Sequence, residues 1–236
     1  MKHRACLTLI FILLISLAGL QSASAGVIES YAILVNKSSA LPSDYEPSDL
    51  TRPDVKYAPG VAESRKQMRA DAAHALEDLF KAAANDGIEL LAISGYRSYW
   101  TQNDLYNRRL KETSLEYVSV YVAKPGQSEH QTGLAMDLGC AGYTDLTERF
   151  AETPAYAWLS EHAHEHGFII RYPKDGTAET GYAYEPWHIR YLGDLAEDVY
   201  ESGLTLESWY AQRLGRSRTY EAFQFPVSEL ALRGLN

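Results

Sequence analysis

Two short stretches of the sequence hold residues that could perform chemistry together. The first, SEHQTGLAMD, contains His130 and Asp137, and the second, YEPWH, contains Glu185 and His188. A catalytic zinc ion takes three protein ligands from His, Asp, Glu or Cys and leaves a fourth position to water, whose proton a nearby carboxylate must accept. The residue types therefore predict zinc ligation by His130, Asp137 and His188. Glu185 is the candidate general base.

Local patterns predict the backbone that positions these side chains. Leu134–Leu138 is an apolar run after a glycine, typical of a buried strand, and it would place Asp137 near the end of that strand. Pro186 disfavours helix at Glu185, so the Glu-x-x-His pair is expected in extended or turn backbone. This pattern differs from His-Glu-x-x-His, in which helical spacing sets the geometry.

Other segments are expected to build the scaffold. Residues 61–85 carry apolar side chains at helical spacing and end before Gly87, which predicts a helix. Ile88–Ser94 is predicted as a buried strand, and the helix that follows runs from Tyr99 to about Lys111 with Ser98 as its N-cap. Further helices are expected at residues 154–166, 193–203 and 205–214, and strands at residues 117–122 and 168–171.

Arg97 lies at the predicted strand-to-helix junction, within the stretch GYRS. A fixed guanidinium can stabilise an oxyanion or grip a carboxylate with two hydrogen bonds. A lone Arg is more often part of a surface salt bridge. The context at the end of a buried strand nevertheless favours a place for Arg97 in the site.

Taken in order, these blocks resemble the VanY-type D-alanyl-D-alanine carboxypeptidases and the related LdcB-type L,D-carboxypeptidases. These are zinc peptidases of the group that includes lysostaphin-like enzymes and hedgehog domains. The resemblance rests on SxHxxGxAxD followed by EPWH, on SGYRS with Gln102, and on the stretches LVNK and HIRYLG, and it runs from about Leu34 to about Leu206. The expected fold is α+β, a single domain in which a small antiparallel sheet carries the zinc site and helices pack against the sheet.

The resemblance implies a zinc-dependent carboxypeptidase that removes the terminal D-Ala from peptidoglycan stem peptides, with D,D- or L,D-specificity. In the family, the Arg at the position of Arg97 lines the active site. Ser128 and Gln102 are implied to help bind the peptide through its terminal carboxylate. Stem peptides are therefore the expected partner, and the protein is expected to be a monomer.

Three other functions stay open. A peptidoglycan endopeptidase would cut inside a stem or a cross-bridge with the same zinc chemistry. A D-Ala-D-Ala dipeptidase would act in the cytoplasm, which the N-terminal leader of this chain speaks against. A non-catalytic zinc module would bind wall peptides or a protein partner, and its sequence mark would be the loss of the base or of a ligand. All four of those residues are present here.

Composition limits the partners and the compartment. The chain has 236 residues and a formal net charge of −9, which disfavours binding to nucleic acid or to an anionic membrane. Residues 1–25 have the basic start, apolar core and small-residue cleavage site of a signal peptide, and the core is shorter than the ~20 residues that span a bilayer. We therefore expect export to the periplasm, the cell wall or the medium, with membrane contact only if the leader is not cleaved.

The predicted organisation has four parts. They are a signal peptide at residues 1–25, an extended N-terminal wrap at residues 26–60, the zinc peptidase domain at residues 61–214 and a C-terminal tail at residues 215–236.

Two other features of the sequence resemble metal ligands but are interpreted as decoys, that is, as residues that bind no metal. Cys140, three residues after Asp137, is interpreted as a small buried hydrophobe rather than a ligand. His162 and His166 have the i, i+4 spacing that can hold a metal, but Ala163 stands where a zincin would carry its base. A second metal site is therefore not expected.

Overall fold

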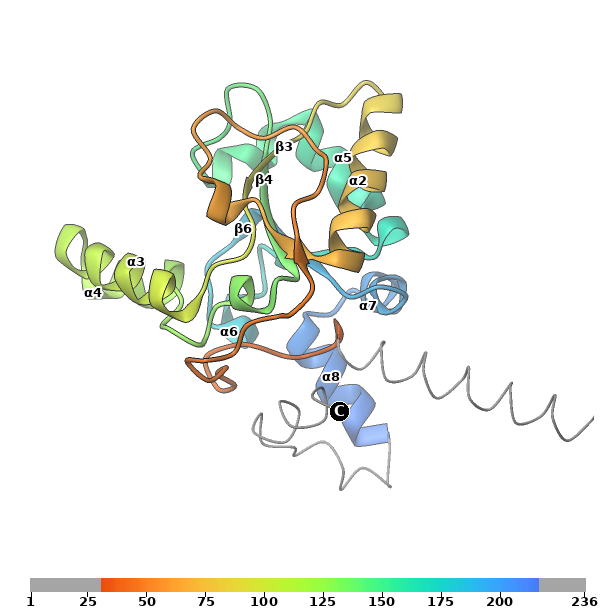
Figure 1. Cartoon of the computed structure of the whole chain (residues 1–236). Coiled ribbons are helices and arrows are strands. Elements are labelled where there is room, and N and C mark those ends of the chain that lie inside the picture. The colour runs from red at the N-terminus through yellow and green to blue at the C-terminus, as the bar shows by residue number, and fades with distance from the viewer. Residues whose placement is uncertain (1–30, 217–236) are drawn as a thin grey trace, which may run out of the picture. The chain divides into compact units, whose positions relative to one another are not determined.

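The computed structural model describes residues 31–216 of the chain (Figure 1). Its contacts divide the chain into two compact units, Met1–Ile33 and Leu34–Asn236, and the second contains every element discussed below. The predicted signal peptide lies outside the described residues, as do residues 217–236 of the predicted tail. Within residues 31–216, no helix combines the length and the apolar character needed to cross a bilayer.

A four-stranded antiparallel sheet forms the centre of the second unit. Its strand order is β3-β4-β6-β5. The strands are β3 (Leu91–Ser94), β4 (Ala135–Gly139), β5 (Phe168–Tyr172) and β6 (Glu185–Tyr191). All residues of β4, and all of β6 except the last, are buried, so other elements cover both faces of the two central strands. The predicted α+β fold with a small antiparallel sheet is confirmed.

The register of the sheet brings the two chemical motifs side by side. In the pair of β4 and β6, Asp137 lies opposite His188, and Met136 lies opposite Ile189. Directly opposite residues share a face of a sheet, whereas successive residues point to opposite faces. Asp137 and His188 therefore face one side together, while the fully buried Met136 and Ile189 pack on the other.

Helices cover the sheet and its β5 edge. α2 (Ala70–Asn85) buries a stripe of small and apolar residues and packs against the 3-10 turn η4 (Ala163–His166), which continues α5 (Pro154–His162). α7 (Leu195–Ser202) and α8 (Leu206–Arg216) pack on β5 through a hydrophobic cluster that includes Ile169, Leu192 and Trp209. The helix predicted for residues 154–166 thus ends as a 3-10 turn.

The helix predicted for residues 61–85 begins only at Ala70. The residues before it form the 3-10 turn η1 (Glu63–Arg65) and the strand β2 (Met68–Arg69), which pairs with β1 (Leu50–Thr51). Met68 is fully buried as expected, but as a strand residue opposite Thr51. Pairing with a distant segment has overridden the local helical spacing.

The segment predicted as an extended wrap lies against the loop that carries His130. Within residues 34–60, β1 is the regular element, and Tyr57 forms an isolated bridge with Ala92 of β3. The side-chain amide of Gln131 donates hydrogen bonds to the carbonyl oxygens of Pro42 and Tyr45, at 2.9 and 3.2 Å. The wrap therefore helps to hold the loop in place.

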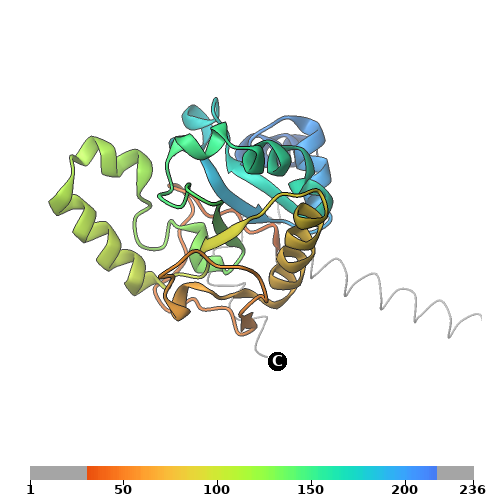
Figure 2. The ribbon, with the colours of Figure 1, turned by 90° about the horizontal axis from the view of Figure 1, so that it is seen from above.

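α3 (Tyr99–Glu112) and α4 (Leu115–Tyr121) form a helical hairpin that projects from the sheet, at the left of Figures 1 and 2. The strand predicted for residues 117–122 is wrong, because α4 occupies this stretch. Ser114 caps α4 by accepting a hydrogen bond from the Tyr117 amide, and the rings of Tyr117 and Tyr121 stack one turn apart at 4.6 Å. Only Val118 of α4 is buried, so the alternating valines have no sheet to join.

Candidate zinc site and active-site cavity

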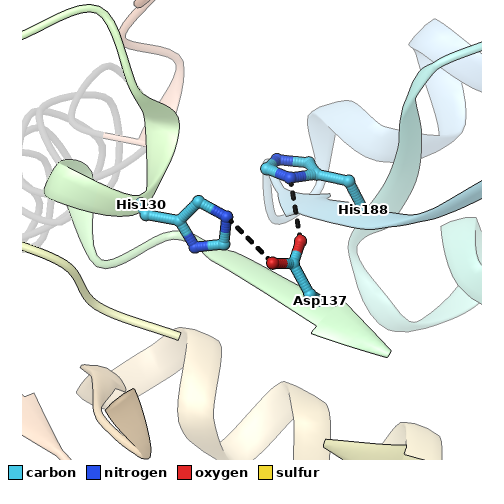
Figure 3. Close-up of side chains that lie close together, drawn as sticks. All are labelled: His130, Asp137 and His188. Atoms are coloured by element: carbon cyan, nitrogen blue, oxygen red, sulfur yellow. Dashed lines mark ion pairs between the residues drawn. The ribbon is translucent and has the colours of Figure 1, made fainter. Parts of the chain in front are cut away.

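The three predicted metal ligands come together where β4 and β6 pair. The ligand atoms of His130, Asp137 and His188 lie within 4.8 Å of one another, and each residue is at most 4% exposed. Figure 3 shows Asp137 between the two imidazoles. Its Oδ2 lies 3.3 Å from His130 Nε2, and its Oδ1 lies 3.1 Å from His188 Nδ1. Both carboxylate oxygens are therefore directed at ring nitrogens.

The 3-10 turn η2 (Glu129–Thr132) holds His130 in place. Its Nδ1 lies 2.8 Å from the carbonyl oxygen of Gly95 and donates to it, so Nε2 is the nitrogen left to face Asp137. Gly133 ends η2 with a φ of +70°, and an added Cβ would lie 2.9 Å from Leu50 Cδ2. Left-handed backbone and the close approach of β1 together explain glycine at this point of the motif.

Glu185 begins β6, is 9% exposed, and has its Oε2 3.8 Å from His188 Nδ1. The extended backbone predicted for the Glu-x-x-His pair is confirmed. Residues three apart in a regular strand point to opposite faces. Here, however, β6 advances four residues from Glu185 to Ile189 while its partner β5 advances two. This bulge turns Glu185 toward the same site as His188.

Burial and neighbouring charges change the proton affinities of these groups. Burial by itself raises the pKa of Asp137, but the two imidazoles beside it hold that pKa well below its usual value. Burial raises the pKa of Glu185 to about 8 against the opposing effect of His188. Burial also acts to lower the pKa of His188, but the carboxylates of Asp137 and Glu129 raise it to about 9. At neutral pH and without a metal, Glu185 and His188 therefore both carry a proton.

The donor set fits zinc. Two imidazole nitrogens and one carboxylate oxygen are the three protein ligands of a common catalytic zinc site, which keeps an open position for substrate or water. Asp137 Oδ1 is buried and makes no hydrogen bond with any described residue, although it faces His188 Nδ1. A cation shared by these groups would satisfy that oxygen.

All seven predicted site residues line one cavity of about 520 Å³. Arg97 is half-buried there, and its Nε is buried with no hydrogen-bond partner among the described residues. Ser128 and Gln102 are almost fully buried. The Gln102 side-chain amide donates to the carbonyl oxygen of Ala123 at 2.6 Å, so Gln102 also ties α3 to the end of the hairpin.

The cavity lies between the α3–α4 hairpin and the loop after β4. The hydroxyl of Tyr121 donates to Glu148 Oε1 at 3.3 Å, so the two walls meet at this point. Leu146, in the opposite wall, has a φ of +52°, which is strained backbone for a residue with a side chain. Strain of this kind is concentrated at functional sites, which supports the assignment of the cavity as an active site.

Sequence reasoning missed three buried charged residues next to the cluster. Glu129, Arg171 and Arg190 have fully buried side chains, and both guanidinium groups contact the Glu129 carboxylate. A signal was present, because Arg171 and Arg190 interrupt the apolar stretches FIIRY and HIRYL. A charged side chain within a buried strand requires a partner of opposite charge.

The two decoys lie apart from the cluster. His162 Nδ1 pairs with Glu165 Oε1 at 3.2 Å, and the His162 ring packs on Trp158. Cys140 is half-buried directly after β4 and is not among the clustered ligand atoms. Within the part of the chain that the structure describes, His130, Asp137 and His188 are the one group of His, Cys, Asp or Glu side chains close enough to hold a metal.

Comparison with known proteins agrees with this geometry. The family model described as VanY, D-alanyl-D-alanine carboxypeptidase, matches residues 65–194. A D-alanyl-D-alanine carboxypeptidase of Enterococcus faecalis is 34% identical over 192 residues. The match covers 75% of this chain and 64% of that protein, so the chain spans slightly less than two thirds of this relative's length.

Two solved structures share the fold. The LdcB LD-carboxypeptidase aligns with a TM-score of 0.71 and 44% identity, over 75% of this chain and 84% of the other. A variant of the D,D-pentapeptidase VanY in complex with Zn(II) aligns with a TM-score of 0.63 and 34% identity, over 77% of this chain and 99% of the other. The residues that the family model matches, 65–194, include the four-stranded sheet, the ligand cluster and the residues that line the cavity.

The raised pKa values of His188 and Glu185 predict that zinc binding is coupled to proton release. A ligating imidazole nitrogen must be free of its proton, and a nearby cation favours the ionised carboxylate. Zinc should therefore release more than one proton at pH 7, and its affinity should rise by about tenfold per pH unit for each proton released, up to about pH 9. Calorimetry in buffers with different heats of ionisation counts the protons. Glu185→Gln should release about one proton fewer, and a zinc affinity independent of pH would contradict the assignment.

Proposed function

Because the chain belongs to the VanY D-alanyl-D-alanine carboxypeptidase family, we propose that it removes the terminal D-Ala from peptidoglycan stem peptides as a zinc-dependent carboxypeptidase. The observation that carries the proposal is the complete set of groups in one cavity. Three clustered ligands, a buried carboxylate 3.8 Å from one of them and the side chain of Arg97 line the same cavity. Both D,D- and L,D-cleavage fall within the proposal, since structures of both kinds of enzyme are similar to this chain.

Glu185 transfers the protons of the reaction. His130, Asp137 and His188 would hold the zinc ion, which would supply a Lewis acid to polarise the scissile carbonyl and acidify water. The Glu185 carboxylate accepts a proton from the attacking water and passes it to the leaving amine. Burial raises its pKa to about 8, which favours the protonated form that the second step needs. The charge of the cation favours the ionised form that the first step needs.

Arg97 and its neighbours bind the substrate. Arg97 lines the cavity beside the ligand cluster, where its guanidinium can donate to the developing oxyanion or to the terminal carboxylate. Ser128 precedes η2, and its side chain makes no capping hydrogen bond. We assign Ser128 and Gln102 to the same carboxylate-binding end of the cavity. Such a contact would make cleavage depend on a free C-terminus.

The proposal extends to the compartment and to the oligomeric state. Residues 1–25 have the composition of a signal peptide, and peptidoglycan lies outside the cytoplasmic membrane. We infer that the enzyme is exported. One chain supplies all seven site residues, so action as a monomer needs no second copy.

Replacing the base separates catalysis from metal binding. Glu185→Ala should keep one zinc per chain and lower kcat by about two to four orders of magnitude, the usual contribution of a general base. Metal analysis and initial rates on a defined stem peptide measure the two effects. Glu161→Ala, a change to an exposed glutamate of α5, is the control and should leave kcat unchanged. Near-normal kcat in Glu185→Ala would remove the base from the mechanism.

The carboxypeptidase claim is tested by amidating the terminal D-Ala of the best stem peptide. A charged hydrogen bond to the carboxylate contributes about 1.5–3 kcal/mol, so amidation should lower kcat/KM by roughly 10- to 150-fold. Mass spectrometry of the products gives both rates. An endopeptidase would cleave the acid and the amide equally.

The same two substrates test the role of Arg97. If its guanidinium grips the carboxylate, Arg97→Ala should cleave both forms slowly and lose most of the preference for the acid. A preference that survives in Arg97→Ala would assign the carboxylate to other residues, with Ser128 and Gln102 the next to test.

A further inference from the structure

A cluster of buried charges lies behind the zinc ligand His188. Glu129, Arg171 and Arg190 each have side chains that are 0% exposed. The three come from different parts of the chain, since Glu129 begins η2, Arg171 is in β5 and Arg190 is in β6. Charges buried to this extent cost stability unless their partners are well placed, and buried ion pairs can often be replaced by apolar residues of similar volume without loss of stability. Their position beside the metal site points to a role other than stability.

The two oxygens of the Glu129 carboxylate have different partners. Oε1 accepts hydrogen bonds from both arginines, from Arg171 Nε at 2.6 Å and from Arg190 Nη1 at 2.7 Å. Oε2 instead faces His188 Nε2 at 3.4 Å. The arginines thus hold the carboxylate so that one oxygen is directed at the imidazole.

We propose that Glu129 is a positioning residue for the zinc site, which fixes the tautomer of His188. An ionised carboxylate can only accept a hydrogen bond, so His188 Nε2 must be the nitrogen that carries the proton. His188 Nδ1, directed at Asp137 Oδ1, is then the nitrogen free to bind the metal. Ligating histidines generally donate their second ring N–H in this way, and loss of the acceptor typically weakens metal binding 10- to 100-fold. The inference rests on the zinc ligands of the proposed function.

A second carboxylate holds the arrangement from outside. Arg171 Nη1 and Nη2 form a fork on Glu207 at 2.8 and 2.6 Å, and Glu207 belongs to the first turn of α8. Asn36 donates to the same Glu207 at 3.2 Å. A chain of charged contacts therefore runs from α8 through Arg171 and Glu129 to His188. Within residues 31–216, Glu207 makes no hydrogen bond or ion pair with a zinc ligand, which makes it a matched control.

Glu129→Gln is the sharpest variant, because the geometry dictates how the amide must orient. The position of Oε1 receives two arginine donors, so the amide oxygen must take it. The amide nitrogen then faces His188 Nε2 and donates to it. This reverses the hydrogen bond and favours the proton on Nδ1, the nitrogen that should bind zinc. The variant therefore keeps the size of the side chain but favours the opposite tautomer of His188.

The experiment compares zinc affinities by competition with a chromophoric chelator at fixed pH. We expect Glu129→Gln to bind zinc 10- to 100-fold more weakly than the unmodified protein. Glu207→Gln also removes a carboxylate from Arg171, so it should lower the melting temperature but stay within about threefold of the normal zinc affinity. Equal losses in both variants, or no loss in Glu129→Gln, would overturn the proposal. Zinc affinity needs no substrate, so a failure of the proposed peptidase activity leaves this test intact.

A measurement on the unmodified protein covers the case in which Glu129→Gln does not fold. Nitrogen NMR of the zinc-loaded protein with labelled histidine identifies the protonated and the metal-bound nitrogens of each ring. His188 should carry its proton on Nε2 and bind zinc through Nδ1. Zinc on Nε2 of His188 would contradict the proposal whatever the variants do.

Discussion

The antiparallel register of β4 and β6 is the constraint on which the site depends. It places Asp137 directly opposite His188, with the fully buried Met136 and Ile189 on the other face. A slip of one residue would send either ligand into the core and an apolar side chain into the cavity. Burial of Met136 and Ile189 on one face of the sheet therefore keeps Asp137 and His188 on the face that binds the metal. His130 joins from a turn rather than a strand, held by the hydrogen bond of its Nδ1 to the Gly95 carbonyl at the end of β3.

Charge balance is the second constraint on this buried site. The carboxylates of Glu129, Asp137 and Glu185 are matched by the guanidinium groups of Arg97, Arg171 and Arg190, which line the cavity or lie directly behind it. Without a metal, protons on His188 and Glu185 add two positive charges, because both pKa values are raised. A zinc ion that displaces those two protons leaves the buried charge unchanged. The site can therefore exchange protons for metal without a large electrostatic cost.

Much of the site could be predicted from the sequence because its residues lie in short motifs whose spacing is visible without the fold. Four residues of three types, His130, Asp137, Glu185 and His188, identify the chemistry by their spacing, and Pro186 disfavours helix at Glu185. The fold was harder wherever distant segments decide the structure. The spacing around Met68 predicts a helix, but the segment pairs with β1 and forms a strand. The alternating valines of α4 predict a strand, but only Val118 is buried and the segment is a helix. The contacts of Glu129 with Arg171 and Arg190 span 42 and 61 residues of sequence, beyond any local pattern.

The central claim is that one zinc ion joins η2, β4 and β6 at the cavity. Anomalous diffraction at the zinc edge, from crystals of the zinc-loaded protein, tests it most directly. The account predicts one strong peak per chain, coordinated by His130 Nε2, a carboxylate oxygen of Asp137 and His188 Nδ1 at about 2.0–2.2 Å. A peak on the His162–His166 face, or a coordination sphere that includes Cys140 in place of one of the three ligands, would contradict it.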